Sequence, residues 1–205
     1  MFIELTDHLR CPADHDESFL VLLPDRMEGR SVRTGHLGCP VCGRTFQFVD
    51  GVLDTGDAPA PGVGSGSALD ADALTTLVGL HGPGGYLTLV GPVASLWSDV
   101  AELNPGVALV AVNPPAEICD AAELSVLRGA SLLMKSGSMR GVVLGRPFAD
   151  DPYWIRESAR VVLPGLRVVG EGDDPAPELL ELLASADGVW VGTKPRQVTP
   201  LDPRP

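Results

Sequence analysis

The chain has 205 residues, of which 44% are hydrophobic and 20% are charged, and its 15 basic and 27 acidic side chains give a net charge of −12. This composition is that of a soluble globular protein with one or two domains. Because its two lysines and thirteen arginines are scattered, the sequence excludes direct binding to nucleic acid or to an anionic membrane surface, both of which need clustered positive charge.

The amino-terminal sequence argues against export. Residues 1–7 include acidic side chains where a signal peptide carries basic ones, and no later stretch has the roughly eighteen apolar residues that a membrane span needs. Four cysteines are also too few for a disulfide scaffold. We therefore expect a cytoplasmic protein with reduced thiols.

The first part of the chain is predicted to form a small, β-rich domain. Residues 18–23 are an apolar run, residues 44–49 alternate, and Asp50-Gly51 predicts a turn. Residues 55–67 are rich in Gly, Pro and Ser and contain almost nothing to bury, which is typical of a flexible linker. The small domain is therefore expected to cover residues 1–54.

Residues 68–196 show helices that alternate with short apolar strands, which is typical of a parallel sheet covered on both faces. We therefore expect an α/β fold, a Rossmann-like three-layer α/β/α sandwich, with a Pro-rich tail over residues 197–205. The helices are expected at 68–78, 94–103, 117–127, 152–162 and 177–186. The strands are expected at 86–90, 107–112, 131–134, 141–144, 166–169 and 188–192.

A metal site is predicted in the small domain. Cys39-Pro40-Val41-Cys42 has the spacing of a zinc knuckle, in which two thiolates on a tight turn face one ion. Cys11-Pro12 opens a second turn upstream, where either Asp14 or His15 could supply the fourth ligand. We favour His15, because neutral imidazole suits a structural zinc site better than a carboxylate. With Cys11, His15, Cys39 and Cys42 bound, the zinc has no open position for catalysis.

Residues 9–53 resemble the small zinc-ribbon family whose members are activator subunits of tRNA, rRNA and protein methyltransferases. The resemblance rests on Leu9-Arg10-Cys11-Pro12, on the segment from Gly38 to Phe46 and on the closing Val49-Asp50-Gly51-Val52. It implies a zinc-ribbon fold and a methyltransferase as partner or fusion. Asp14 or His15 stands where the family has a cysteine.

The second part resembles class I methyltransferases at residues 158–169 and 188–195, although only one closing strand is visible where that family has two. The resemblance implies a glycine-rich turn after the first strand and an acid after the second, which together hold S-adenosylmethionine. Here Gly91 is followed by Pro92, which lacks an amide donor, and Asn113 stands where the acid is expected.

These departures favour a non-catalytic, zinc-binding accessory subunit on a degenerate methyltransferase fold, a pseudoenzyme with no catalytic residues. Its acidic surface and its ribbon would meet a protein partner or a larger assembly. The alternative is an active S-adenosylmethionine-dependent methyltransferase, in which Gly91 and Asn113 contact the donor and Asp151 or Tyr153 the substrate. Asp151 is otherwise expected to cap a helix, and Cys119 to be a buried helical thiol.

Overall fold

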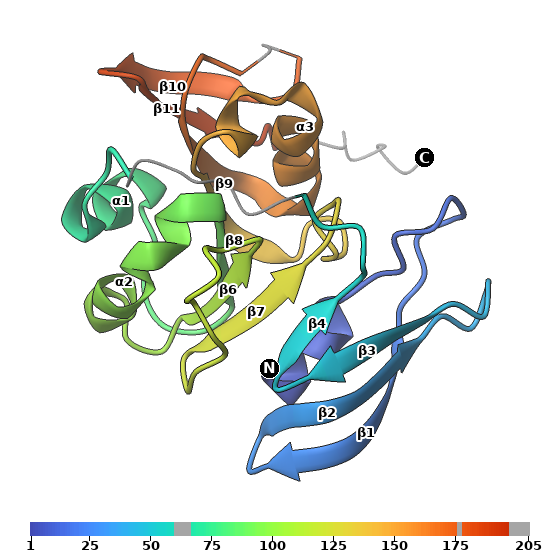
Figure 1. Cartoon of the computed structure of the whole chain (residues 1–205). Coiled ribbons are helices and arrows are strands. Elements are labelled where there is room, and N and C mark those ends of the chain that lie inside the picture. Colours follow the sequence, from blue (N-terminus) through green and yellow to red (C-terminus); the bar gives the residue numbers. More distant parts are fainter. Residues whose placement is uncertain (60–66, 176–177, 197–205) are drawn as a thin grey trace, which may run out of the picture.

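The computed structural model describes residues 1–59, 67–175 and 178–196 (Figure 1), so residues 60–66 of the expected linker and the expected tail 197–205 lie outside the described residues. Its helices are η1 (Ile3–His8), α1 (Ala71–Val78), η2 (Gly91–Leu96), α2 (Trp97–Leu103), η3 (Phe148–Asp150) and α3 (Pro152–Val161). Its strands are β1 (Val21–Glu28), β2 (Ser31–Gly38), β3 (Thr45–Val49), β4 (Val52–Asp54), β5 (Tyr86–Val90), β6 (Ala108–Val112), β7 (Leu124–Arg128), β8 (Met139–Leu144), β9 (Val162–Glu171), β10 (Glu181–Ala186) and β11 (Val189–Thr193).

All of these strands belong to one sheet of 11 strands in the order β1-β2-β3-β4-β7-β6-β5-β8-β9-β11-β10. The strands from β4 through β9 in this order run parallel, whereas β1 to β4 form an antiparallel ribbon at one end and β11 and β10 are antiparallel at the other. The ribbon joins the parallel part through β4 and β7, where Val52 is paired with Val126. The ribbon and the Rossmann-like part therefore share one continuous sheet.

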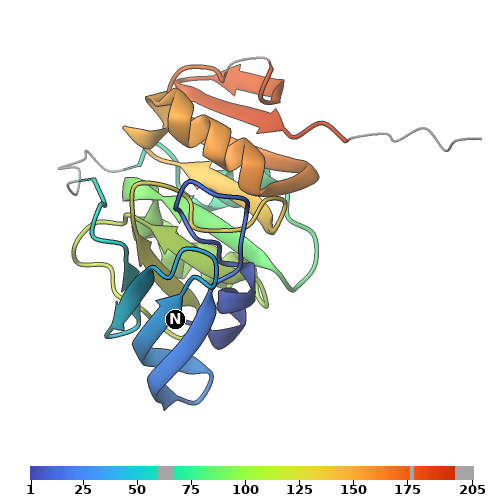
Figure 2. The same cartoon turned by 90° about the vertical axis from the view of Figure 1, so that its right-hand side faces the viewer.

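The parallel strands lie between two covering layers, which confirms the expected three-layer α/β/α fold. The helices α1 and α2 pack on one face, against side chains such as Leu87, Leu109 and Val143. Figure 2 looks onto the other face, which α3 and the amino-terminal segment cover together. The five residues of β5 are all buried, as expected for a central strand that is covered on both sides.

The amino-terminal segment takes the place of crossover helices. The segments before and after β7 (113–123 and 129–138) contain no helix, and η1 lies on this part of the sheet with Leu5 and Leu9 fully buried. Backbone hydrogen bonds hold it there, because the Arg10 amide donates to the Leu133 carbonyl at 2.7 Å and the Lys135 amide donates to the His8 carbonyl at 2.7 Å. The amino terminus therefore completes the core of the Rossmann-like part.

Two elements predicted around β7 are wrong. The expected helix 117–127 is a loop followed by β7, whose residues Leu124 to Leu127 are buried between β4 and β6. The spacing of Leu124 and Leu127 fits a helix, but β7 lies between two strands and pairs with both, and this tertiary context outweighs the local propensity. The expected strand 131–134 is an irregular segment with a single bridge between Leu9 and Met134.

The expected helix 177–186 is also wrong, since Glu181–Ala186 form strand β10. The reason is the turn that follows, in which Asp187 and Gly188 both have positive φ, 53° and 73°, and Ala186 is paired with Val189. Such a two-residue turn closes a β-hairpin, and Asp-Gly is its preferred sequence. The sheet consequently has two closing strands, β10 and β11, where the sequence indicated one.

The remaining strands and helices of residues 68–196 are confirmed, with shifts of a few residues at their ends. The clearest case is the strand 86–90, which β5 reproduces. The helix expected from 68 begins at Ala71, because the Asp70 carboxylate accepts a hydrogen bond from the Ala73 amide at 2.8 Å and caps it. In the ribbon, Asp50-Gly51 forms the predicted turn between β3 and β4.

Candidate metal centre and donor edge

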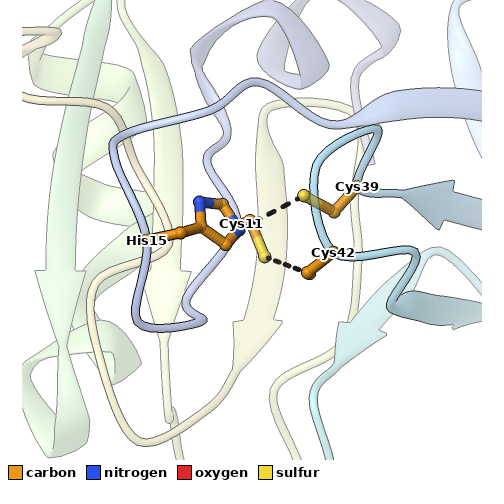
Figure 3. A group of neighbouring side chains, drawn as sticks. All are labelled: Cys11, His15, Cys39 and Cys42. Atoms are coloured by element: carbon orange, nitrogen blue, oxygen red, sulfur yellow. Dashed lines mark hydrogen bonds between the residues drawn. The ribbon is translucent and has the colours of Figure 1, made fainter.

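Two turns, one before β1 and one between β2 and β3, carry the predicted metal ligands (Figure 3). Cys39 follows the last residue of β2, and the chain folds back so that the Gly43 amide donates to the Cys39 carbonyl at 3.0 Å and the Cys39 amide to the Arg44 carbonyl at 2.8 Å. Gly43 has a φ of +71°, which favours glycine. This tight turn points the thiols of Cys39 and Cys42 toward the second turn.

The second turn begins at Cys11, whose amide donates to the Ser18 carbonyl at 3.0 Å and so closes a short loop. The loop carries His15, whose Nδ1 lies 2.7 Å from the Asp16 carbonyl oxygen. A metal-binding imidazole usually makes such a contact with its other nitrogen, which fixes the ring and leaves Nε2 for the ion. The segment thus presents one thiol and one imidazole to the knuckle.

The four side chains form a cluster of ligand atoms that all lie within 4.8 Å of one another: Cys11, His15, Cys39 and Cys42. The Sγ atoms of Cys11 and Cys42 are 3.7 Å apart, and the Cys39 Sγ is 3.4 Å from the His15 Nε2. A tetrahedral zinc ion with ordinary bond lengths has sulfur–sulfur edges of about 3.8 Å and sulfur–nitrogen edges of about 3.6 Å. The cluster could therefore hold zinc. Asp14, the other candidate, is not part of it.

The surroundings set the two innermost thiols apart in acidity. Burial raises the pKa of the Cys11 thiol to about 11. Desolvation acts in the same direction on Cys39, but hydrogen bonds from the amides of Cys42 and Val41 outweigh it and bring the pKa of Cys39 to about 6. Without metal, Cys39 is thus mainly a thiolate at neutral pH, whereas Cys11 keeps its proton.

Zinc affinity is expected to rise with pH. Because the pKa of Cys11 is about 11, binding must displace its proton throughout the neutral range, so this thiol alone raises the affinity about tenfold per pH unit. Competition for zinc with a chromophoric chelator, at pH values from about 6 to 8, measures the slope. An affinity that stays constant over this range would contradict the proposed role of Cys11.

The second site expected from the sequence lies at the carboxyl ends of the parallel strands, where α/β sheets bind ligands. Gly91 follows β5 with a φ of +75°. A Cβ atom built on Gly91 would lie 2.6 Å from ring carbons of Phe148, and the Phe148 side chain is buried. The aromatic ring therefore fills the space on the side of Gly91 to which a side chain would point.

Asn113 follows β6 at the same edge, and its side chain is already hydrogen-bonded to the backbone. Its side-chain nitrogen donates to the Gly129 carbonyl at 2.8 Å, and its side-chain oxygen accepts from the Gly129 amide at 2.9 Å. Both polar atoms of this buried amide thus bind the backbone. In this conformation the Phe148 ring thus covers the Cβ side of Gly91, and Asn113 is hydrogen-bonded to Gly129.

The structure also places the other residues that were singled out in the sequence. Asp151 caps α3, since its carboxylate accepts a hydrogen bond from the Tyr153 amide at 2.8 Å. Tyr153 is 44% exposed. The expectation for Cys119 was wrong, because it is exposed on the loop before β7. Sequence reasoning missed Phe148 and Gly129, which have no local signal because their partners are more than a dozen residues away.

Comparison with known proteins finds no family model and no curated protein that matches the chain. Among solved structures it is similar to a geranyl diphosphate methyltransferase in complex with sinefungin, with 16% identity over 49% of this chain and 43% of that one and a TM-score of 0.42. It is similar to the [4+2]-cyclase SpnF, with 15% identity, the same coverage and a TM-score of 0.40. It is also similar to a complex between the Haloferax volcanii Trm112 methyltransferase activator and a methyltransferase, with 17% identity over 47% and 50% and a TM-score of 0.40. In each case the match spans half or less of the other chain.

In the part of the chain that the structure describes, no helix combines the length and the apolar character needed to cross a bilayer.

Proposed function

We propose that this chain is a zinc-bound accessory protein with a methyltransferase-like fold that binds no methyl donor. One observation carries the proposal: the Phe148 ring lies over Gly91, 2.6 Å from where a Cβ atom would be. In this proposal the buried ring stays in place and keeps a donor away from that side of the turn. The paired amide of Asn113 supports the same proposal, since both of its polar atoms already bind the Gly129 backbone.

The zinc in this proposal is structural. Cys11, His15, Cys39 and Cys42 fill the four positions of a tetrahedral ion, which leaves no place for a water molecule to be activated. When bound, the ion would tie the loop after η1 to the turn between β2 and β3. The expected division into residues 1–54 and 68–196 remains part of the proposal.

Titration calorimetry of the zinc-loaded protein with S-adenosylmethionine and its demethylated product tests the proposal. We expect no heat up to millimolar ligand. Binding in the micromolar range, about −8 kcal/mol, would contradict it. A protein heated until it unfolds serves as the blank for heats of dilution.

An active S-adenosylmethionine-dependent methyltransferase is the second candidate, and the presence of both closing strands, β10 and β11, favours it. This function requires Phe148 to swing away from Gly91 and Asn113 to release Gly129. Binding of the donor in the calorimeter would favour this candidate. Loss of that binding in Asn113→Ala, measured at a temperature at which circular dichroism shows the variant still folded, would then place Asn113 at the donor.

A further inference from the structure

A cavity of about 430 Å³ lies at the amino ends of the parallel strands, opposite to the edge of Gly91. Its walls are mainly apolar and come from both parts of the fold: Phe2 precedes η1, Ala101 belongs to α2, and Pro105 and Val107 connect α2 to β6. Two exposed carboxylates, Glu102 and Glu123, complete the lining. The cavity therefore combines apolar walls with two exposed acidic groups.

A second cavity, of about 460 Å³, shares Glu102 with the first and is lined by Asp70, Asp72 and Asp99 as well. Neither lining contains a lysine, an arginine or a histidine. Among the described residues, Glu102 and Glu123 also take part in no ion pair. We call the two cavities together the acidic groove.

The position of Glu102 is unfavourable for the fold itself. It lies in the last turn of α2, a helix with no basic residue in that turn, where the helix dipole favours cations and opposes anions. A residue that breaks a local rule without compensation in its own fold is more often explained by binding than by stability. A cation in the groove would form an ion pair with Glu102 and would also interact favourably with the carboxyl end of α2.

The geometry points to the acidic groove as a docking site for a basic segment of a partner protein, in which arginine or lysine side chains alternate with apolar ones. The apolar side chains would contact Phe2, Pro105 and Val107, and the cationic groups would pair with Glu102 and Glu123. Charge complementarity favours this occupant over a second copy of the chain, whose net charge is −12. The inference rests on the proposed accessory function, to which it gives a partner.

The test uses the full-length, zinc-loaded protein and a fluorescent ten-residue peptide that alternates arginine with leucine. The same peptide with citrulline in place of arginine controls for shape without charge. Fluorescence anisotropy is measured for the natural chain, for Glu102→Gln/Glu123→Gln and for Glu178→Gln/Glu181→Gln. The last variant makes the same change of charge at exposed acids outside the groove.

We expect the arginine peptide to bind the natural chain at least tenfold more tightly than it binds the groove variant. We also expect it to bind the natural chain at least tenfold more tightly than the citrulline peptide does. The control variant should bind as the natural chain does. The inference would be overturned if both variants weakened peptide binding equally, or if the citrulline peptide bound as tightly as the arginine peptide. It would also be overturned if the arginine peptide did not bind at millimolar concentration, or if spermidine bound more tightly than this peptide. Donor calorimetry is independent of this result, so a donor-binding chain with an occupied groove would refute only the proposed function.

Discussion

Replacing Cys39 by serine is expected to release zinc and to lower the free energy of unfolding by about 4 kcal/mol when zinc is present at a thousand times its dissociation constant. The physical reason is that the folded cluster of four ligands would hold zinc, whereas the separated side chains of the unfolded chain would not. Denaturant unfolding with and without a chelator measures the change, and metal analysis of the purified protein measures zinc content.

The matched control is Cys119→Ser, because Cys119 is an exposed thiol outside the cluster. It should keep its zinc and change the stability by less than about 0.5 kcal/mol. Equal stability of the Cys39 variant and the natural chain in the presence of zinc would rule out a structural metal at this place.

The same assay identifies the fourth ligand. His15→Ala is expected to weaken zinc binding strongly, whereas Asp14→Ala should leave it unchanged, because only His15 lies within the cluster. The reverse result would assign the site to Asp14 and would require the loop after Cys11 to rearrange.

The second large effect is expected at the carboxyl end of β5, where Gly91→Ala should lower the free energy of unfolding by about 3 kcal/mol. Part of the cost is the positive φ of 75°, which is unfavourable for alanine. The larger part is the collision of the new methyl group with the Phe148 ring. Denaturant unfolding measures the sum, and a double-mutant cycle with Phe148→Ala separates the two contributions.

In that cycle Phe148→Ala alone should cost about 3–5 kcal/mol, as is typical when a buried aromatic ring is removed. Its ring also makes an edge contact with Trp154, with centroids 4.7 Å apart. Adding Gly91→Ala to this background should then cost only about 1 kcal/mol, the part that belongs to the backbone. The same cost in both backgrounds would mean that Phe148 does not cover Gly91.

These expected effects explain why the substitution of Gly91 alone cannot distinguish an active enzyme from a non-catalytic scaffold. In the structure a larger residue there disturbs the buried Phe148 in either case. Loss of activity in such a variant would therefore not identify a donor site.

The sequence was most informative where the signal is local. Cys39 and Cys42 are three residues apart on one turn, and Asp50-Gly51 has the chemistry of a tight turn, so both could be placed without a partner. The capping role of Asp151 is of the same kind. Each depends on a few neighbouring residues and not on the rest of the fold.

The errors arose where distant parts of the chain decide the structure. Residues 124–127 have helical spacing, but β4 arrives from the ribbon and pairs with them as a strand. Phe148 covers Gly91 from 57 positions along the sequence, and Gly129, directly after β7, binds the side chain of Asn113. The turn Asp187-Gly188 was a local signal that could have identified the hairpin, and it was outweighed by the leucines before it.

The seating of η1 on β6 and β7 implies an order of events during synthesis. The first residues can pair with the ribbon early, because the Ile3 amide donates to the Arg30 carbonyl and the Val32 amide donates to the Met1 carbonyl. Their bonds to Leu133 and Lys135 form only after more than a hundred further residues have been made, and contacts of such long range close slowly. Until the parallel strands are in place, the apolar surface around Leu5 and Leu9 is only partly covered and is a candidate for chaperone binding.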